Sequence, residues 1–296
     1  MAIKVPGSLG ALQYITESTY GTTPTSTDFS YFGFMSNMQE TGGGEEEGQI
    51  GDGSRIFETV LHKIRSAGFD ATLSMFRDNG SEYYLKSLVG TAYAPTADLP
   101  SFTSFMKIDR DEYVMFTGCK IDTLVLASEG VGSKVTARLT VKALKHLPHQ
   151  ASKAGYGSLG EENSGPTTKT PVIYDAYPTT SLSGNGATIP AKSFQYTISN
   201  NLEEEEGIIS GEALAAGSGL VPGECNIELE YTLLSKSFYW DNLKLAGTDG
   251  ITITHVIGEH TYVFTNCYIV TDDHPSRAQS SYDETVRFKA GGLTVS

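Results

Sequence analysis

The sequence predicts a mainly β chain, built as two tandem antiparallel β-sandwich or barrel domains that each carry one short α-helix. Three observations lead to this fold class. First, 296 residues suffice for two domains of roughly 100–150 residues. Second, most apolar segments alternate apolar and polar residues with a period of two, which is typical of half-buried strands. Third, the second half of the chain repeats short patterns of the first half in the same order.

The clearest repeat is FTGCKI at 116–121, which returns as FTNCYI at 264–269. Four further pairs follow in the same order: Glu45–Glu47 with Glu204–Glu206, the alternating segments that begin at Phe69 and Cys225, LVGT at 88–91 with LAGT at 245–248, and Lys142-Ala143 with Lys289-Ala290. We therefore predict a tandem duplication. Copy one spans residues 1–150, a linker and the N-terminal segment of copy two span 151–190, and the rest of copy two spans 191–296. The repeat-equivalent core residues are expected to be Phe116, Cys119, Ile121, Phe264, Cys267 and Ile269.

In copy one, the alternating pattern predicts strands over residues 31–38, 69–76, 102–108, 113–126 and 134–144, the fourth broken near Gly118. Residues 39–66 are rich in glycine and glutamate and predict a long loop. Residues 81–89 predict a helix, because Ser81 is a candidate N-cap and a glycine follows the last turn. The same order in copy two predicts strands over 193–199, 224–233, 251–257, 262–271 and 283–288, a loop over 201–223 and a helix over 235–245.

The sequence contains no motif of a phosphate loop, a zinc protease, a serine hydrolase or a dinucleotide-binding fold. GVGSK at 130–134 joins two expected strands, so a hairpin turn explains it better than a phosphate loop. His146 and His149 are the closest pair of histidines, and the DDHP segment at 272–275 lacks further ligands, so a solvated loop and a turn are the better interpretations. We expect no catalytic residue, no metal site, no cofactor and no enzymatic activity.

Charge and cysteine content restrict the function further. Thirty-five acidic and 21 basic residues give a formal net charge of −14, which opposes tight binding of nucleic acid. Three cysteines cannot all pair within one chain, which is typical of a reducing compartment. The N-terminus has no apolar run of signal-peptide length, and no segment approaches the ~20 apolar residues of a membrane span. We therefore expect a soluble protein that is made in a cytoplasm and has no membrane partner.

The acidic runs are the candidate interaction sites. Side-by-side carboxylates are normally a feature of solvated loops. Both runs, however, occur at the same place in the repeat, and the first lies in a long loop that also carries apolar residues. Apolar residues in such a loop need burial, and a neighbouring subunit would provide it. The candidate contact residues are Glu45, Glu46, Glu47, Ile56, Phe57, Glu204, Glu205 and Glu206.

Residues 12–24 (LQYITESTYGTTP) resemble the N-terminal segment of the tail tube proteins of tailed bacterial and archaeal viruses. The order of a strand, a glycine-rich loop, a strand, a short helix, a hairpin and a strand also resembles that family. The resemblance implies a domain that forms six-membered rings around a lumen, with rings stacked through the loops at 39–66 and 201–223. Because this chain carries two such domains, we expect a homotrimer that forms a pseudo-hexameric ring.

The resemblance also implies a location and partners. We expect a structural protein of the virion tail, present in the host cytoplasm before assembly, that contacts itself and the tail terminator, tape measure and baseplate proteins. Its lumen is expected to conduct the genome during ejection, with an acidic wall along which DNA slides without specific binding. Two alternatives stay open: another self-assembling tail component, such as a completion, baseplate or decoration protein, and a carbohydrate-binding β-sandwich, supported only by the acids at 109–112.

Overall fold

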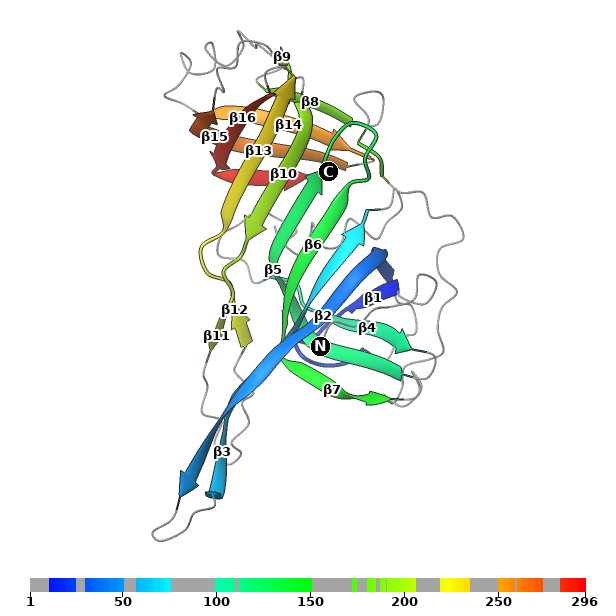
Figure 1. Cartoon of the computed structure of the whole chain (residues 1–296), viewed down its shortest axis with the longest axis vertical. Coiled ribbons are helices and arrows are strands. Elements are labelled where there is room, and N and C mark those ends of the chain that lie inside the picture. The colour runs from blue at the N-terminus through cyan, green and yellow to red at the C-terminus, as the bar shows by residue number, and fades with distance from the viewer. Residues whose placement is uncertain are drawn as a thin grey trace.

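The computed structural model describes residues 11–24, 30–50, 57–75, 99–109, 112–150, 172–174, 180–184, 187–189, 191–205, 219–234, 250–258, 260–273 and 283–296. This part of the chain is built of antiparallel strands and turns, and it contains no helix long and apolar enough to cross a membrane. The helices expected at 81–89 and 235–245 lie outside the described residues. Figure 1 shows the strands of the second half above those of the first half, with one long hairpin projecting from the body.

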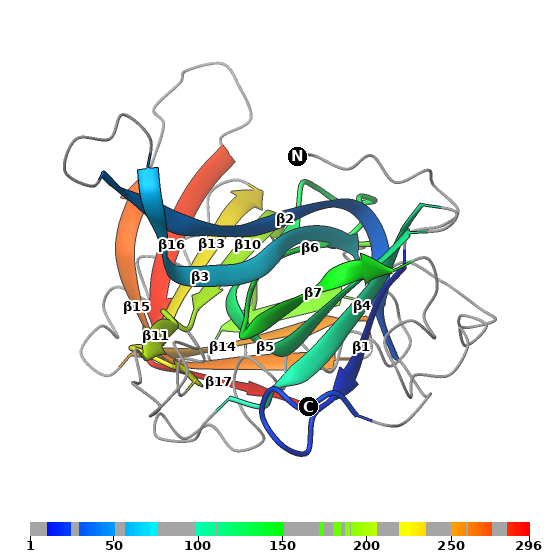
Figure 2. The ribbon, with the colours of Figure 1, turned by 90° about the horizontal axis from the view of Figure 1, so that it is seen from below.

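The first half forms a closed circuit of paired strands. Following the pairings, the circuit runs β1–β2–β3–β6–β5–β4 and returns to β1, and β7 adds to β5. Figure 2 shows this curvature from below. The strands are β1 (Ala11–Thr16), β2 (Ser30–Ile50), β3 (Phe57–Ser74), β4 (Phe102–Asp109), β5 (Glu112–Ser128), β6 (Thr136–Ala143) and β7 (Lys145–Gln150).

The second half repeats these pairings. With β8, β10, β13, β14, β15, β16 and β17 in the places of β1 to β7, every pairing of the first half except β1–β2 recurs among the described residues. The strands are β8 (Thr180–Gly184), β9 (Ala187–Thr188), β10 (Ala191–Ser199), β11 (Glu203–Glu205), β12 (Gly219–Val221), β13 (Asn226–Leu234), β14 (Ile251–Ile257), β15 (His260–Asp273), β16 (Asp283–Ala290) and β17 (Gly292–Val295). β11 and β12 form a separate short hairpin.

Irregularities recur at matching places too. Gly118 in β5 and Asn266 in β15 both have positive φ, at 65° and 52°. A side chain does not fit at Gly118, because its Cβ would lie 2.6 Å from the Cβ of Leu144. One residue before the left-handed residue, the carbonyl of Thr117 accepts the Leu144 N–H at 3.0 Å, and the carbonyl of Thr265 likewise accepts an N–H at 3.0 Å. Glycine and asparagine are the residues that tolerate this backbone best.

Four sequence predictions are corrected. The first is the match of Glu45–Glu47 with Glu204–Glu206: because Gly42 lies opposite Ala67 as Ile198 lies opposite Ile227, the residues that correspond to Glu45–Glu47 are 201–203. The loop expected at 39–66 is mostly the paired arm of β2 and β3, in which Gly44 lies opposite Arg65. Backbone hydrogen bonds make this ladder, so its glycines and glutamates do not prevent it. β5 continues through Gly118 instead of breaking there. Finally, Phe69 corresponds to Leu229 and not to Cys225, because Phe69 lies opposite Val141 and Leu229 opposite Phe288, in matching places on β6 and β16.

One apolar cluster joins residues of both halves. Along the strands every second side chain enters it, as the burial of alternate residues in β6 and β10 shows. The residues expected as repeat-equivalent core lie in it as follows: Phe116, Cys119, Ile121, Phe264 and Cys267 are buried, and Ile269 is partly buried against the cluster. This burial supplies the main stabilising free energy of the sheet.

Candidate assembly interface

The two halves are joined by direct strand pairing. β5 and β10 run antiparallel, with Ser128 opposite Phe194 and Thr123 opposite Ser199 at the two ends of the ladder. The circuit of the first half and the strands of the second half therefore share one continuous sheet in the order β2–β3–β6–β5–β10–β13–β16–β15. In Figure 1 the strands β6, β5, β10 and β13 lie side by side in this sheet. The junction between the halves is a piece of ordinary antiparallel sheet.

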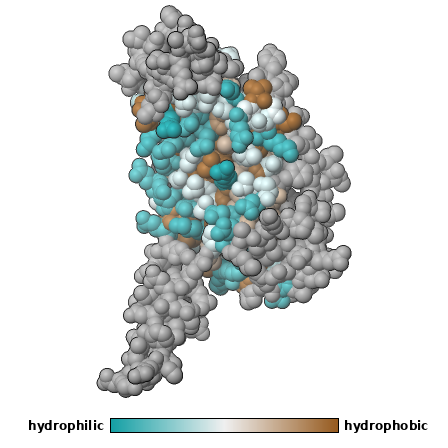
Figure 3. Space-filling model, viewed as in Figure 1, coloured by the Kyte–Doolittle hydropathy of each residue, from teal (hydrophilic) through white to brown (hydrophobic). Residues whose placement is uncertain are grey.

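The outer face of this sheet is polar. Figure 3 views it directly and shows hydrophilic residues across its middle. A groove of ≈ 270 Å³ opens on the part formed by the second half, where Gln195, Thr197 and Val270 are among the lining residues. The charged residues of the face carry both signs: Asp70, Glu228 and Glu230 are acidic, and Arg138, Lys142, Arg287 and Lys289 are basic. Neighbouring strands thus present opposite charges, as in the 2.7 Å ion pair between Arg287 and Glu230.

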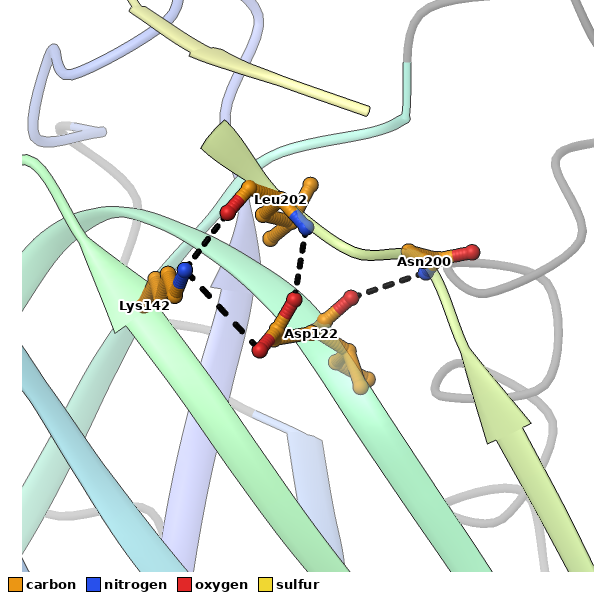
Figure 4. A network of polar contacts seen from close by, with 5 residues as sticks. Asp122, Lys142, Asn200 and Leu202 are labelled. Carbon is orange, nitrogen blue, oxygen red and sulfur yellow. Dashed lines mark hydrogen bonds and ion pairs between the residues drawn. The ribbon is translucent and has the colours of Figure 1, made fainter. Parts of the chain in front are cut away.

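A polar network closes one end of the junction (Figure 4). The register of β5 against β6 shifts at Asp122, and this bulge turns the residue towards the second half. The Asp122 carbonyl accepts the Asn200 N–H at 2.7 Å, and its carboxylate accepts the Leu202 N–H at 2.7 Å. Lys142 donates to the Leu202 carbonyl at 2.5 Å and lies 4.0 Å from the Asp122 carboxylate. The Asn200 side chain donates to the carbonyl of Ile121 at 2.8 Å.

A second contact holds the β11–β12 hairpin against the first half. Lys120, only 3% exposed, donates to the carbonyl of Leu220 at 2.8 Å. Its ammonium lies 4.8 Å from the centre of the Tyr20 ring, and the Tyr20 hydroxyl accepts the Leu220 N–H at 3.1 Å. Leu220 also packs with Leu99 and Leu202 in a small apolar cluster. A buried ammonium needs such partners, since desolvation without them is costly.

The segment that carries the sequence resemblance supports the same junction. The carboxylate of Glu17 accepts hydrogen bonds from Gly118 N–H at 2.8 Å, Thr103 hydroxyl at 2.8 Å and Gly21 N–H at 2.9 Å. Gly21 has φ of 69° and leaves no room for a Cβ beside Leu144. The glutamate and the glycine of the segment therefore fix its course over β4 and β5, which brings Tyr20 to Lys120.

At each end of the continuous sheet, part of the last strand is paired on one side only. Beyond Phe34, β2 pairs with β3 alone among the described residues. From Tyr268 to Asp273, β15 pairs with β16 alone in the part that the structure describes. Two large apolar side chains lie exposed at this second edge, Tyr268 at 51% and Val270 at 55%. Unpaired edges with exposed apolar residues are sites where another strand can add.

The candidate contact residues lie on the two arms where the structure describes them. Glu45, Glu46 and Glu47 belong to the outer part of β2, Phe57 is the first residue of β3, and Glu204 and Glu205 belong to β11. Ile56 and Glu206 lie outside the described residues. The structure places Glu204 opposite Leu220, next to the contact with Tyr20, so the arm of the second half is docked on the first half.

The groups considered for chemistry are unsuited to it. Burial, aided by the nearby Glu17 carboxylate, raises the pKa of the Cys119 thiol well above its ordinary value, and burial raises the pKa of Cys267 to about 12. Both thiols therefore stay protonated and are poor nucleophiles. His146 stacks on Phe116. No group of three potential metal ligands occurs among the described residues. The GVGSK segment is a hairpin turn between β5 and β6, as predicted.

Sequence reasoning missed the junction network. Its signal was present but weak: Lys120 and Asp122 flank the core residue Ile121 in a segment otherwise typical of a buried strand. Charged residues at such positions are costly unless they have partners, so they mark a contact with another part of the chain. Which part they contact could not be read from the local pattern.

Comparison with models of protein families identifies the family of this chain. The model of a protein family described as phage tail tube protein matches residues 7–292. A search of the curated proteins finds no match.

Proposed function

Because the chain belongs to the phage tail tube protein family, we propose that it polymerises into stacked rings that form the tail tube and conduct the genome. Members of this family are structural proteins of the virion tail, and this chain is not an enzyme. Self-assembly therefore takes the place of a catalytic site. Its proposed partners are other copies of itself and the terminator, tape measure and baseplate proteins of the tail.

A tandem duplication of one tube domain is part of the proposal. It is supported by the recurrence of the strand pairings, of the left-handed residue in β5 and β15, and of the hydrogen bond beside it. Copy one occupies residues 1–150 and ends with β7. The segment at 151–190 contains β8 and β9 as the N-terminal part of copy two, and residues 191–296 contain the rest.

The single observation that carries the ring is the β5–β10 junction. It joins the first copy to the second through a strand pair whose counterparts, β15 and β2, lie at the two edges of the same chain. Pairing β15 of one chain with β2 of the next repeats the internal junction between chains. Such a head-to-tail contact closes into a ring when the rotation permits. Six domains then come from three chains, which form a pseudo-hexameric homotrimer.

The long arm formed by β2 and β3 is proposed to stack one ring on the next. It projects away from the body in Figure 1, and it carries Glu45, Glu46, Glu47 and Phe57. The acidic segment Glu203–Glu205 of β11 lies on the shorter arm of copy two. Adjacent rings would bury the apolar residues of these arms, Ile56 included.

An acidic lumen completes the proposal, since an acidic wall repels DNA and keeps it mobile. Its support is the net charge of −14 per chain. The polar face of the sheet carries acids and bases on neighbouring strands. Acidic and basic residues therefore nearly balance on this face, and the proposed acidity of the lumen is supported only by the net charge of the whole chain.

Negative-stain electron microscopy of the concentrated chain tests the proposal. We expect rings with a central hole and threefold symmetry, and tubes of stacked rings. Single rings that never stack would favour a completion or terminator-like tail component instead. A chain that stays monomeric at every concentration, with or without a tail initiation complex, would contradict both.

A further inference from the structure

We propose that consecutive chains join through a more apolar version of the internal junction, in which Tyr268, Val270 and Lys289 of one chain receive the base of the β2 arm of a second copy. The proposal rests on the proposed function, because it assumes that copies of this chain pair edge to edge. It goes further in naming the residues of the contact and their chemistry.

The pairing registers define which residues correspond. Lys289 lies opposite Tyr268, as Lys142 lies opposite Lys120. Both ladders then skip one residue of the long strand, Val270 in β15 and Asp122 in β5. The receiving edge of copy two therefore has Tyr268 in the place of Lys120, Val270 in the place of Asp122, and Lys289 in the place of Lys142.

The arms correspond in the same way. Gly43 lies opposite Ser66 and Glu47 opposite Leu61 in the arm of copy one. Ser199 lies opposite Asn226 and Glu203 opposite Val221 in copy two. The three residues between these pairs then match one to one: Gly44 corresponds to Asn200, Glu45 to Asn201 and Glu46 to Leu202.

The backbone part of the internal junction can be repeated between chains. The Asp122 carbonyl accepts the Asn200 N–H inside the chain, so the Val270 carbonyl accepts the Gly44 N–H of the next copy. The ladder that continues from there would place Gly43 opposite Thr271, as Ser199 lies opposite Thr123. Main-chain bonds of this kind give affinity in β-augmentation, and side chains give specificity.

Only the lysine of the side-chain part can be repeated. Inside the chain, the Asp122 carboxylate accepts the Leu202 N–H, and Lys142 donates to the Leu202 carbonyl. Between chains, Val270 offers no carboxylate, but Lys289 can donate to the backbone carbonyl of Glu46 as Lys142 does to that of Leu202. Burial of Tyr268 and Val270, both more than half exposed in the single chain, would add apolar contact. The fixed junction inside the chain is thus polar, and the junction that forms on assembly combines apolar burial with one lysine-to-carbonyl contact.

Charge reversal at Lys289 tests this contact in the full chain. We expect Lys289→Glu to raise the concentration needed for ring formation by about tenfold, because a carboxylate would face the Glu46 carbonyl, and Lys289→Arg, which keeps a cationic donor, to stay within about threefold of the unsubstituted chain. Lys134→Glu is the matched control, because Lys134 is exposed in the turn before β6 and its substitution changes the net charge equally. Sedimentation velocity over a concentration series measures the threshold, and circular dichroism confirms the fold.

A cysteine pair provides a second measurement. Thr41→Cys with Asp273→Cys, in a Cys225→Ser background, should form a disulfide between chains. Val125→Cys with Thr197→Cys, which lie opposite each other in the internal ladder, should form one within the chain. Rings that Lys289→Glu does not weaken, an equal loss in Lys289→Arg, or no disulfide between chains in formed rings would overturn this inference and leave the proposed function standing. Absence of rings from the unsubstituted chain would overturn both.

Discussion

Acid should destabilise this protein through one buried histidine. His255 has no exposed surface, and its Nδ1 contacts the Tyr196 hydroxyl. Its Nε2 has no hydrogen-bond partner among the described residues. A proton on this ring would have to enter an apolar core among Tyr174, Phe194 and Tyr196, whose rings surround it. Burial accordingly lowers the pKa of His255 from 6.5 to about 3.

The sign and size of the effect follow from linkage. The folded state excludes a proton that the unfolded chain binds below pH 6.5, so stability is full above that pH and falls progressively towards pH 3. A pH of 4.5 lies about two pH units below the pKa of the unfolded side chain, so the unfolded state binds a proton that the folded state does not. The free energy of unfolding is therefore lower by about 2.7 kcal/mol than at neutral pH. That is a large part of the roughly 5–15 kcal/mol by which domains are stable.

The assay compares unfolding by urea at pH 7 and pH 4.5, followed by circular dichroism on the unassembled chain. Other acids also titrate in this range, so the informative quantity is the difference between the wild type and His255→Met. Methionine is the matched choice, because the buried Met106 lies opposite Val114 as His255 lies opposite Tyr262. We expect the variant to lose about 2.5 kcal/mol less than the wild type on acidification.

Tyr262→Phe is the control in the same core. Its hydroxyl is buried with no hydrogen-bond partner among the described residues, and burial raises its pKa far above the tested range. Its removal should change stability little and leave the acid dependence unaltered. If His255→Met lost as much stability as the wild type between pH 7 and pH 4.5, the buried neutral imidazole would not be the cause.

Three further outcomes are expected. Glu17→Ala should cost about 2–5 kcal/mol in urea unfolding, because it leaves the buried donors of Gly118 and Thr103 without their acceptor; a cost under about 1 kcal/mol would contradict this. Gly118→Ala should cost at least ~1–3 kcal/mol through its positive φ and the contact with Leu144, whereas Gly130→Ala, where a Cβ meets nothing, should stay within ~0.5 kcal/mol by the same method. Deletion of residues 48–60, which include the paired outer ends of β2 (48–50) and β3 (57–60), should leave rings that do not stack under the electron microscope; normal tubes would refute the stacking role.

The sequence was informative where a strand is half buried. In ITITHVI at 251–257 the alternation places His255 on the same face as three isoleucines, so its burial could have been read from the pattern. The recurrence of FTGCKI as FTNCYI likewise found two segments whose aromatic and cysteine side chains are buried in both halves. In each case the signal is local and the physical cause is the removal of every second side chain from water.

The arms and the junction could not be predicted in the same way. The stretch GGGEEEG at 42–48 has no alternation, and its strand character comes from backbone bonds to a partner more than ten residues away. The pairing of β5 with β10 joins residues about 70 positions apart in sequence, and no local pattern specifies it. Only buried charges such as Lys120 indicated that a contact from elsewhere in the chain was needed.

The two arms differ at one backbone position, and this difference bears on why the chain should polymerise. At Asn201 φ is 46°, and the arm of copy two turns there and docks its β11–β12 hairpin on the first half. At the corresponding Glu45 the arm of copy one continues as β2, with only a register shift. The arm of copy two thus makes its contact within the chain. The arm of copy one does not, because the edge that would receive it, β15, lies at the opposite end of the same chain's sheet. A head-to-tail contact of this kind gives a closed ring only if the junction between chains turns by the same angle as the junction within the chain. The skipped residues Asp122 and Val270, which stand at matching places in β5 and β15, would impose that equal angle.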